Sequence, residues 1–406
     1  MPLNKKSLVI VCAQFYPTNH IAAHRINSLV KYWDKEKYLI TVYAHGDEKK
    51  EFELEGVKVF VLPGNYFLGL KQQKPGISKW KHNLISLNNV LMRKFSNQDY
   101  FGWTKRVTNL VIQNHDSITV LFTTFSPVDA HLVGFNLKKK FPNAYWIADM
   151  RDEMSANQML KKSIQQYYAS VEQKIISKVD LITAISSPIL YGFKGAKDYL
   201  EVRNGFDHSF EPTKERNNFF TFIYAGTFYG KRKPDIFLGV LLKLHRENLL
   251  PTDWKLKFLG THRNFNIPET LLPFIEFYPS RTNEEVIQDL LMSDCLLLIH
   301  PPSNAKGIFT GKVFDYLSVQ RPILAMVDIQ DVAAELIHEC NAGFSIDFYD
   351  EIGIKDGILK CIDIWKGNRD FLCNQEKIHS LHRRFQVEKL VTFVEEKLNN
   401  GENATI

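Results

Sequence analysis

Two short basic stretches of this sequence could bind an anion. Residues 226–234 read GTFYGKRKP, where two glycines permit a tight loop and three consecutive cations follow. Residues 310–312 read TGK and open a helical pattern that runs to Val319. Each stretch follows an apolar run typical of a buried strand and precedes a predicted helix, whose first turn offers free N–H groups and the positive end of the helix dipole. Such a site suits a phosphate or diphosphate, and two basic loops can neutralise a diphosphate without metal. The alternative at residues 310–312 is an ordinary capped helix with a solvated lysine.

Polar residues next to predicted strands of the first half could face a ligand as well. Arg25 lies on the first turns of a predicted helix after the first strand, and the alternative interpretation is that it is a surface arginine without a role in binding. Asp149, Arg151 and Asp152 follow the predicted strand Tyr145–Ala148. Charges beside a buried strand are costly unless they are paired or used, so this group is either functional or ion-paired. The Asn-Gly-Phe-Asp turn at residues 204–207 follows another strand and could also face the ligand. The alternative interpretation is that it only reverses the chain.

The elements that must position these residues alternate between strand and helix in both halves of the chain. This alternation predicts a doubly wound, mostly parallel α/β sheet in each half. The ligand cleft is then expected between the halves, at the carboxyl ends of both sheets. The predicted strands of the first half are 8–13, 39–44, 57–62, 119–122, 145–148, 181–184 and 201–202. The predicted helices there are 22–33, 107–113, 129–140 and 163–177.

The second half repeats the pattern after a polar, charged linker at residues 208–218. We predict a first domain over 1–207, a second over 219–385, and a terminal helix over 386–406 that could pack back on the first domain. The predicted strands of the second half are 220–224, 256–259, 275–278, 295–299, 323–325 and 344–346. The predicted helices there are 234–245, 283–292, 311–319, 332–340 and 350–367.

Composition indicates a globular protein of a reducing compartment. The chain has 406 residues, 45% of them hydrophobic and 24% charged, which is ordinary for a globular protein. The five cysteines are scattered and never spaced as C-x-x-C, so we expect neither disulfides nor a zinc site. No signal peptide is recognised, and no apolar run approaches the roughly 20 residues needed to cross a bilayer. A cytoplasmic location is the expectation.

The positive charge is concentrated in one segment rich in aromatic residues. Residues 66–106 carry eight lysines and arginines against one acidic residue, Asp99, while the whole chain has a net charge of +6. Basic residues interleaved with aromatics suit an anionic membrane surface or a pyrophosphate-linked lipid. A solvated surface insertion is the alternative. Nucleic acid is not expected as a partner, because the chain shows no nucleic-acid-binding motif.

Four motifs together resemble the retaining GT-B glycosyltransferases of family 4 (glycosyl transferases group 1), most of all their bacterial surface-polysaccharide branch. The family's D-x-R-D-P-W element reads DMRDEM at residues 149–154, and its G-T-x-Y-x-x-R-x-P loop reads GTFYGKRKP at 226–234. Its T-G-K-x-F-E-Y-L-x-x-x-R-P-I segment reads TGKVFDYLSVQRPI at 310–323, and its N-G-F-D turn stands at 204–207. The resemblance spans nearly the whole chain and implies two Rossmann-like doubly wound domains facing across a cleft.

The resemblance also implies roles for individual residues. Asp315 would bind the ribose hydroxyls, and Asn204 and Gly205 would lie beside the donor at the domain boundary. The implied catalytic residues are Asp149, Arg151, Asp152 and Arg25. The implied donor diphosphate site consists of Gly226, Thr227, Arg232, Lys233, Thr310, Gly311 and Lys312.

The implied reaction moves a hexosyl or N-acetylhexosaminyl group from a UDP- or GDP-sugar. The acceptor would be a saccharide or a polyprenyl-diphosphate-linked saccharide at the inner face of the plasma membrane, in surface-polysaccharide biosynthesis. No cofactor and no metal are expected, because the chain contains no Asp-x-Asp pair. Leaving-group stabilisation would be the main catalytic effect.

Several positions depart from the family pattern, among them the loop at residues 18–22, which lacks the family's glycines, and three positions of the expected donor site. Gly307 stands where the first glutamate of the E-x7-E pattern would be, Asp315 replaces the second, and Thr227 occupies the first basic position of the usual pair. Two other functions therefore stay open. One is a sugar-nucleotide 2-epimerase or hydrolase on the same fold, and the other is a non-catalytic sugar-nucleotide-binding partner.

Overall fold

The computed structural model of the chain consists of two compact units, Met1–Arg203 with Gln386–Ile406, and Asn204–Phe385. Most of the basic segment at 66–106, most of the predicted linker at 208–218, and Tyr229 of the first basic loop lie outside the described residues. The structure describes residues 5–18, 21–64, 78, 80–81, 83–84, 86–87, 100, 102–158, 160–208, 218–228, 230–303, 306–368 and 371–403.

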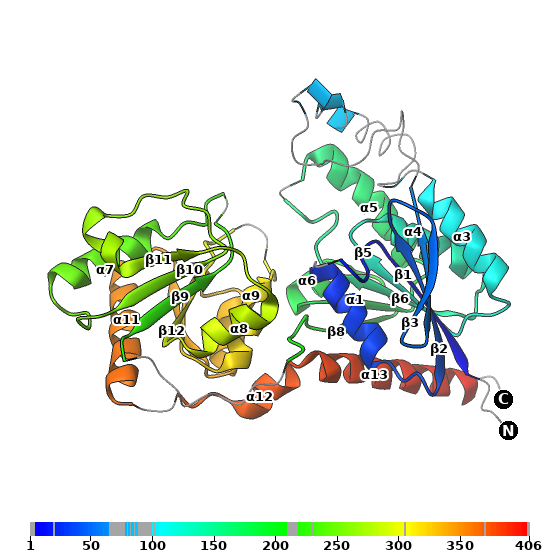
Figure 1. Cartoon of the computed structure of the whole chain (residues 1–406). Coiled ribbons are helices and arrows are strands. Elements are labelled where there is room, and N and C mark those ends of the chain that lie inside the picture. The colour runs from blue at the N-terminus through cyan, green and yellow to red at the C-terminus, as the bar shows by residue number, and fades with distance from the viewer. Residues whose placement is uncertain are drawn as a thin grey trace. The chain divides into compact units, whose positions relative to one another are not determined.

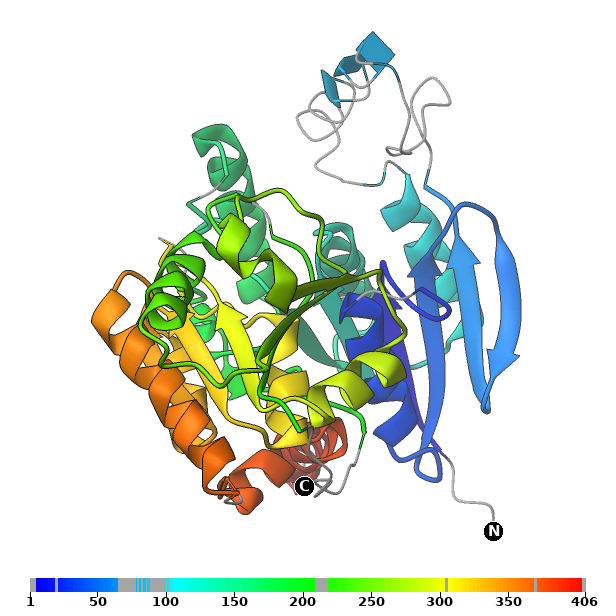
Figure 2. The same ribbon diagram turned by 60° about the vertical axis from the view of Figure 1, so that its left-hand side comes forward.

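The first unit is built on an eight-stranded sheet of order β3-β4-β2-β1-β5-β6-β7-β8. All its strand pairs are parallel except β3–β4, an antiparallel hairpin at one edge (light blue in Figure 2). Its strands are β1 (Lys6–Cys12), β2 (Tyr38–His45), β3 (Lys50–Leu54), β4 (Val57–Leu62), β5 (Val120–Phe125), β6 (Tyr145–Met150), β7 (Leu181–Ala184) and β8 (Asp198–Glu201). Its described helices are α1 (Ile21–Tyr32), α3 (Trp103–Asn114), α4 (Asp129–Lys140), α5 (Lys162–Ile176), α6 (Ser187–Tyr191) and most of α13 (Arg383–Asn403).

Helices cover both faces of this sheet, as the alternation of side chains along a strand requires. In β1, Leu8, Ile10 and Cys12 belong to a core shared with α1 and α13, whereas Val9 and Val11 belong to a core shared with α3, α4 and α5. Figure 1 shows these two sets of helices on opposite sides of the sheet. The strands are therefore apolar on both faces, which explains why they read as continuous apolar runs.

The second unit has a six-stranded parallel sheet of order β11-β10-β9-β12-β13-β14. Its strands are β9 (Thr221–Ala225), β10 (Lys255–Leu259), β11 (Ile275–Tyr278), β12 (Cys295–Ile299), β13 (Ile323–Val327) and β14 (Gly343–Asp347). Its described helices are α7 (Asp235–Arg246), the 3₁₀ helix η2 (Glu269–Phe274), α8 (Asn283–Leu291), α9 (Gly311–Val319), α10 (Val332–Glu339), α11 (Glu351–Lys366) and α12 (Gln375–Ser380). Side chains of β9 alternate between a core with α7 and α11, which includes Phe222 and Tyr224, and a core with α8, α9 and α10, which includes Ile223 and Ala225.

Each sheet has a point where the chain reverses the direction in which it adds strands. In the second unit β9, β10 and β11 proceed toward one edge, and β12, β13 and β14 proceed from β9 toward the other. In the first unit the reversal falls between β1 and β5. Loops diverge at such a point and leave a crevice outside the carboxyl ends of the two strands, which is where doubly wound sheets bind ligands. Both predicted basic loops follow the strands that flank this point, β9 and β12.

The predicted fold class of two Rossmann-like α/β sheets is confirmed. Several elements have their predicted bounds, among them α4 and α9, because their apolar periodicity is strong. Strand β6 runs two residues further than predicted, through Asp149 and Met150. The predictions omitted β3, a charged edge strand of sequence KEFEL, and the short helices α6 and α12. None of the helices that the structure describes is long and apolar enough to cross a bilayer.

Two glycines within helices provide a test of the packing in each unit. A Cβ atom on Gly134 of α4 would lie 2.6 Å from the ring of Trp146, whereas a Cβ on Gly239 of α7 would meet nothing within 4 Å. We predict that Gly134→Ala lowers the free energy of unfolding by about 1 to 3 kcal/mol through overpacking. Gly239→Ala should instead raise it by about 0.5 to 1 kcal/mol, because alanine is the better helix former. Chemical denaturation measures both, and equal shifts of one sign would contradict the packing described here.

Candidate functional site

The helix that follows β12, α9, begins beyond the carboxyl end of that strand, at the chain reversal of the second unit. Thr310 has an extended backbone and is the N-cap of α9, but its side chain makes no capping hydrogen bond. Its hydroxyl oxygen is buried and has no hydrogen-bond partner within the described part of the chain. The first N–H groups of a helix lack intrahelical partners and lie at the positive end of its dipole. A buried hydroxyl without a partner beside them indicates that the α9 N-terminus can receive an oxyanion.

Lys312 lies on the first turn of α9 and reaches back to β9. Its Nζ is 2.6 Å from the hydroxyl oxygen of Tyr224 and 3.9 Å from the centroid of that ring. Gly226, at the end of β9, leaves the space for this side chain, since a Cβ there would lie 2.7 Å from Cε of Lys312. The φ of Gly226 is +113°, which also favours glycine. The basic group of α9 is therefore packed against the end of β9, on the neighbouring strand.

Arg232 belongs to the loop after β9 and is buried, with 8% of its surface exposed. Its Nη2 donates a hydrogen bond to Nδ1 of His300, the first residue after β12. The backbone N–H of His300 donates to the carbonyl of Met326 at 2.9 Å, which fixes His300 at the end of the sheet. The two loops flanking the chain reversal are thus joined by an arginine–histidine contact.

The electrostatics of this site are those of a site prepared for an anion. Burial and the charge of Arg232 lower the pKa of Lys312 to about 7. Burial, Arg232 and Lys312 lower the pKa of His300 to about 4, although Asp331 acts in the opposite direction. Among the described residues Lys312 has no carboxylate partner in an ion pair. An anion bound here would relieve the repulsion between the two cations.

Asp315, the residue predicted to bind the ribose hydroxyls, lies one turn further along α9. Burial raises the pKa of Asp315 to about 6, and the charge of Arg383 opposes this rise. The loop before α9 is shaped by Gly307, whose φ is +81° and whose N–H donates to Oδ1 of Asp331 at 2.8 Å. A glutamate at position 307 would be strained in this conformation. The left-handed backbone at position 307 therefore favours the glycine that stands there over a glutamate.

Not every residue predicted for the diphosphate site is enclosed. Gly226, Arg232, Thr310, Gly311 and Lys312 lie on the two loops and on the first turn of α9, and all are at least half-buried. Thr227 and Lys233 also follow β9, but both are exposed. Among the described residues, no group of three His, Cys, Asp or Glu side chains is arranged to hold a metal ion.

In the first unit, Arg25 and Asp149 form a buried ion pair. The guanidinium of Arg25 donates to both carboxylate oxygens of Asp149, at 2.7 and 3.0 Å, and Asp149 has no exposed surface. The hydroxyls of Thr124 and Thr183 donate to the same carboxylate at 3.0 and 2.8 Å. These threonines pair in register with Asp149 on β5 and β7. Of the two alternatives for Asp149, the structure shows the ion-paired one. The predicted end of the strand at Ala148 was wrong, because the four hydrogen bonds donated to Asp149 allow its carboxylate to lie inside the sheet.

The other two residues predicted as catalytic lie just beyond β6. Arg151 donates from Nε to the carbonyl of Phe125 and from Nη2 to the carbonyl of Ser126, the latter at 3.3 Å. Asp152 is exposed. Arg151 therefore fixes the loop after β5, one of the two strands at the chain reversal of the first unit.

Asn204 and Gly205 lie in a stretch of the second unit that packs against the chain between α12 and α13. Gly205 has φ +62°, and a Cβ there would lie 2.1 Å from the carbonyl oxygen of Leu381. Arg383 donates from Nε to the carbonyl of Asn204 at 3.1 Å and from its backbone to Phe206 at 2.8 Å. Both predicted residues thus have structural contacts in this stretch.

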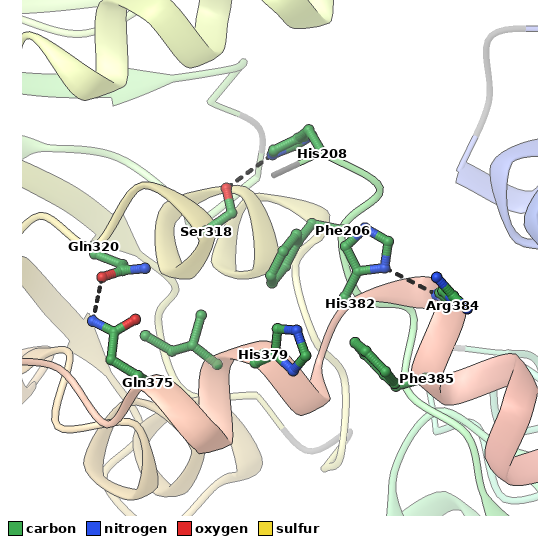
Figure 3. A pocket seen from close by; sticks show the side chains of 10 residues that line it. Phe206, His208, Ser318, Gln320, Gln375, His379, His382, Arg384 and Phe385 are labelled. Atoms are coloured by element: carbon green, nitrogen blue, oxygen red, sulfur yellow. Dashed lines mark hydrogen bonds between the residues drawn. The ribbon is translucent and has the colours of Figure 1, made fainter. Parts of the chain in front are cut away.

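A pocket of about 280 Å³ opens beside this stretch (Figure 3). Phe206 is one of the residues that line it, and so are the members of two hydrogen-bonded pairs, His208–Ser318 and Gln320–Gln375. Ser318 also donates to the carbonyl of Asp315 at 2.7 Å. The pocket lies at the far end of α9 from Lys312.

Sequence reasoning missed two residues of the site, His300 and Tyr224. Tyr224 reads as one more apolar member of a strand, and only its hydroxyl distinguishes it. His300 carries the clearer signal, because it is a titratable residue placed directly after a fully buried strand that precedes a basic helix start. No signal in the sequence connects it with Arg232, which is 68 positions away.

Comparison with known proteins assigns the fold. No protein-family model matches the sequence, and no curated protein matches it. A solved structure described as a glycosyltransferase from Rickettsia africae is 13% identical, with a TM-score of 0.62 over 98% of this chain and 100% of its own. One from E. coli, described as trehalose-6-phosphate bound with UDP-2-fluoro glucose, is 12% identical, with a TM-score of 0.62 over 96% and 99%. An α,α-trehalose-phosphate synthase (UDP-forming) from Burkholderia vietnamiensis is 9% identical, with a TM-score of 0.63 over 96% and 100%. The chain is similar to these proteins in fold, and that fold is GT-B.

The buried pair of the first unit leads to a prediction about stability. Asp149→Asn leaves Arg25 buried without its counter-charge and should lower the free energy of unfolding by about 3 to 5 kcal/mol. Burial acts to raise the pKa of Asp149, but the charge and hydrogen bonds of Arg25 and the bond from Thr183 hold it below the ordinary value. The contribution of the ion pair to the free energy of unfolding is therefore complete above about pH 4, and it is lost as the pH falls through the pKa of Asp149 in the folded protein.

Denaturant unfolding at pH 7 and at pH 3 measures this effect. The control is Lys50→Met, which removes an exposed ion pair with Glu48 and should change the unfolding free energy by less than about 1 kcal/mol. An Asp149→Asn protein as stable as the parent at pH 7 would show that the pair does not support the sheet.

Proposed function

We propose that this protein is a retaining glycosyltransferase that uses a nucleotide-diphosphate sugar, with UDP or GDP as the nucleotide. The observation that carries the proposal is the pair of cations, Lys312 and Arg232, at the ends of the two strands that flank the chain reversal of the second unit. Doubly wound sheets bind ligands at this point, and a diphosphate is the ligand that two adjacent cations and a helix N-terminus recognise.

The comparisons add support from the ligands of similar folds. The E. coli structure is described as bound with UDP-2-fluoro glucose. Another match, 11% identical with a TM-score of 0.62, is described as addressing glycosyl transfer with retention by trehalose-6-phosphate synthase. The same donor class in this chain agrees with the sequence motifs at residues 226–234 and 310–323.

In the proposed reaction, the bond between C1 of the sugar and the diphosphate oxygen breaks, and a bond from an acceptor hydroxyl oxygen to C1 forms on the same face. The acceptor proton goes to the departing diphosphate, so no protein nucleophile is required. Arg232, Lys312 and the first amides of α9 stabilise the charge that accumulates on the leaving group. Asp315 accepts hydrogen bonds from the ribose hydroxyls. Thr227 and Lys233, which are exposed, would contact the donor from the outer side of the loop.

The acceptor is proposed to be a lipid-linked saccharide or an oligosaccharide of surface-polysaccharide biosynthesis, reached at the inner face of the plasma membrane. Residues 66–106 would provide the contact with membrane or acceptor. Arg151 and Asp152 would face the acceptor and donor sugar, while Arg25 and Asp149, enclosed in the sheet, would act by holding the first unit in shape. No metal is part of the proposed site.

Removal of either cation should abolish donor binding without unfolding the protein. We predict that the parent is stabilised by a saturating UDP- or GDP-sugar, by about 2.7 kcal/mol at a hundred times Kd, and that Lys312→Ala and Arg232→Ala lose this response. Thermal unfolding with a panel of nucleotide sugars measures it. Lys243→Ala, on the exposed side of α7, is the control and should respond like the parent. If both site variants respond as well, the site is misassigned.

The charge state of Lys312 should make donor binding depend on pH. The pKa of Lys312 is lowered to about 7 in the free protein, and a bound diphosphate favours the charged form. Affinity for UDP-glucose, whose two phosphates do not titrate in this range, should therefore rise as pH falls through 7. We expect binding about tenfold weaker at pH 8 than at pH 6.

Isothermal titration calorimetry across this range tests that expectation. Lys312→Arg carries a charge that does not titrate, so it should bind with an affinity independent of pH. A parent whose affinity is constant from pH 6 to 8 would contradict the role given to Lys312.

A further inference from the structure

A pocket of about 570 Å³ lies in the first unit, where helix α6 packs beside the edge strand β8 (Figure 1). The chain crosses from β7 to β8 through a helix of only five residues, whereas the crossover from β6 to β7 contains the fifteen residues of α5. A five-residue helix is about 7.5 Å long, so it covers only part of the sheet face beside it. The space that remains is called here the α6–β8 pocket.

The alternation of side chains along β8 decides which of them line this pocket. Asp198 forms an ion pair with Lys397 of α13 at 2.6 Å, and Leu200 packs against the core that α13 shares. Tyr199 and Glu201 therefore project from the opposite face of the strand, and both line the α6–β8 pocket.

Apolar and aromatic side chains make up most of the lining. Leu190 and Phe193 are buried and belong to the core of the first unit. Tyr191 and Tyr199 are exposed over 75% and 39% of their surface. The hydroxyl of Tyr199 accepts a hydrogen bond from the backbone N–H of Ala196 at 2.9 Å, which fixes its ring as one wall. A pocket of this volume, lined mainly by aromatic and apolar groups with a few polar ones, is typical of a small-molecule site.

One carboxylate is fixed within this lining. Glu201 accepts hydrogen bonds from the hydroxyl of Ser187 and from Nε of Arg203, both at 2.6 Å. Burial acts to raise the pKa of Glu201, but these hydrogen bonds and the charge of Arg203 hold it below the ordinary value. The side chain is therefore ionised at neutral pH, and each carboxylate oxygen has a second lone pair that can accept from a ligand.

We propose that the α6–β8 pocket binds a neutral saccharide. Sugar hydroxyls would donate to the carboxylate of Glu201, and the C–H face of a sugar ring would pack on the ring of Tyr191 or Tyr199, whose bodies are apolar. The proposed function assigns none of the pocket residues to the donor or to the acceptor. The inference therefore adds a second ligand site to the chain, and it does not depend on the diphosphate site.

The lining disfavours the other ligand classes that an aromatic pocket could take. The charge of Glu201 is paired with Arg203, so an organic cation would gain little beyond the tyrosine rings. An anion would meet Lys194 of the lining but also the carboxylate. An acyl chain would bury that carboxylate without offering it a hydrogen bond, which is costly. A molecule that combines hydroxyl donors with an apolar face satisfies every part of the lining.

NMR of the full chain with ¹³C-labelled tyrosine tests the class of ligand. The probes are glucose, galactose, maltose, cellobiose and N,N′-diacetylchitobiose, with choline and decanoate as representatives of the disfavoured classes. We expect at least one of the sugars to shift the ring signals of Tyr191 and Tyr199, which are assigned from the Tyr191→Phe and Tyr199→Phe proteins. The proposal is wrong if no sugar shifts them, or if only choline or decanoate does.

Substitutions test whether the sugar lies in this pocket. Tyr191→Ala should weaken binding of that sugar about threefold to tenfold, and Tyr191→Phe, which keeps the ring, should stay within about twofold of the parent. Glu201→Gln should weaken it about tenfold or more, because hydrogen bonds to a charged acceptor are the stronger ones. Tyr349→Ala is the matched control, since Tyr349 is an exposed tyrosine of the second unit, and it should bind like the parent.

Tyr191→Ala also separates loss of binding from loss of the fold. The side chain is exposed, so the variant should unfold at the same temperature as the parent. Saccharide binding that survives both Tyr191→Ala and Glu201→Gln would place the sugar elsewhere and refute the inference.

The two proposals fail independently. Saccharide binding needs no nucleotide and should persist in Lys312→Ala, which loses the donor site. A parent that binds a saccharide in this pocket but no nucleotide sugar would refute the proposed function and support the present inference. A parent that binds nucleotide sugars while no saccharide shifts the tyrosine signals would do the reverse.

Discussion

The placement of two largely buried cations, Lys312 and Arg232, at one end of the second sheet is the constraint on which the candidate site depends. Two cations, one from the loop after β9 and one from the first turn of α9, are kept partly out of water, where charge is costly unless it is paired. Neighbouring side chains contact both cations. Tyr224 offers Lys312 a hydroxyl and a ring face, and His300 offers Arg232 a neutral lone pair. We propose that an anion completes this site, because it would offset the cost of keeping two cations partly out of water.

The same chain treats a second buried cation in the opposite way. Arg25 is paired with Asp149, whose carboxylate also accepts hydrogen bonds from two threonine hydroxyls on adjacent strands. That network connects α1 with β5, β6 and β7 and stabilises the first unit. The contrast explains how two arginines, both adjacent to strand ends, differ in what they can do. Arg25 is part of the scaffold of the first unit, whereas Arg232 contacts the first residue after β12 at the candidate site.

Much of this fold could be predicted from the sequence, because strands buried on both faces read as apolar runs and the turns between them contain glycine or proline. Helix α9 and its basic N-terminus were predictable because the helix has a strong apolar periodicity and directly follows such a strand and loop. The limits appear where a residue depends on distant partners. The end of β6 was misplaced because Asp149 reads as a loop residue until Arg25, 124 positions earlier, is known to reach it. His300 was missed because its partner Arg232 comes from another loop. The left-handed backbone at Gly307 likewise follows from the anchoring carboxylate of Asp331.

The close packing of Lys312 on Gly226 has a consequence for how such a site can change over time. The ammonium group occupies the volume that any larger residue would fill at position 226. A single added methyl group at that position would push the lysine stem out of place, although every charged residue of the site would remain in the sequence. The position of the Lys312 ammonium group is therefore controlled sterically, by a residue with no charge. In a divergent copy of this chain, a substitution at that glycine would displace the lysine while all the basic residues of the sequence stay intact.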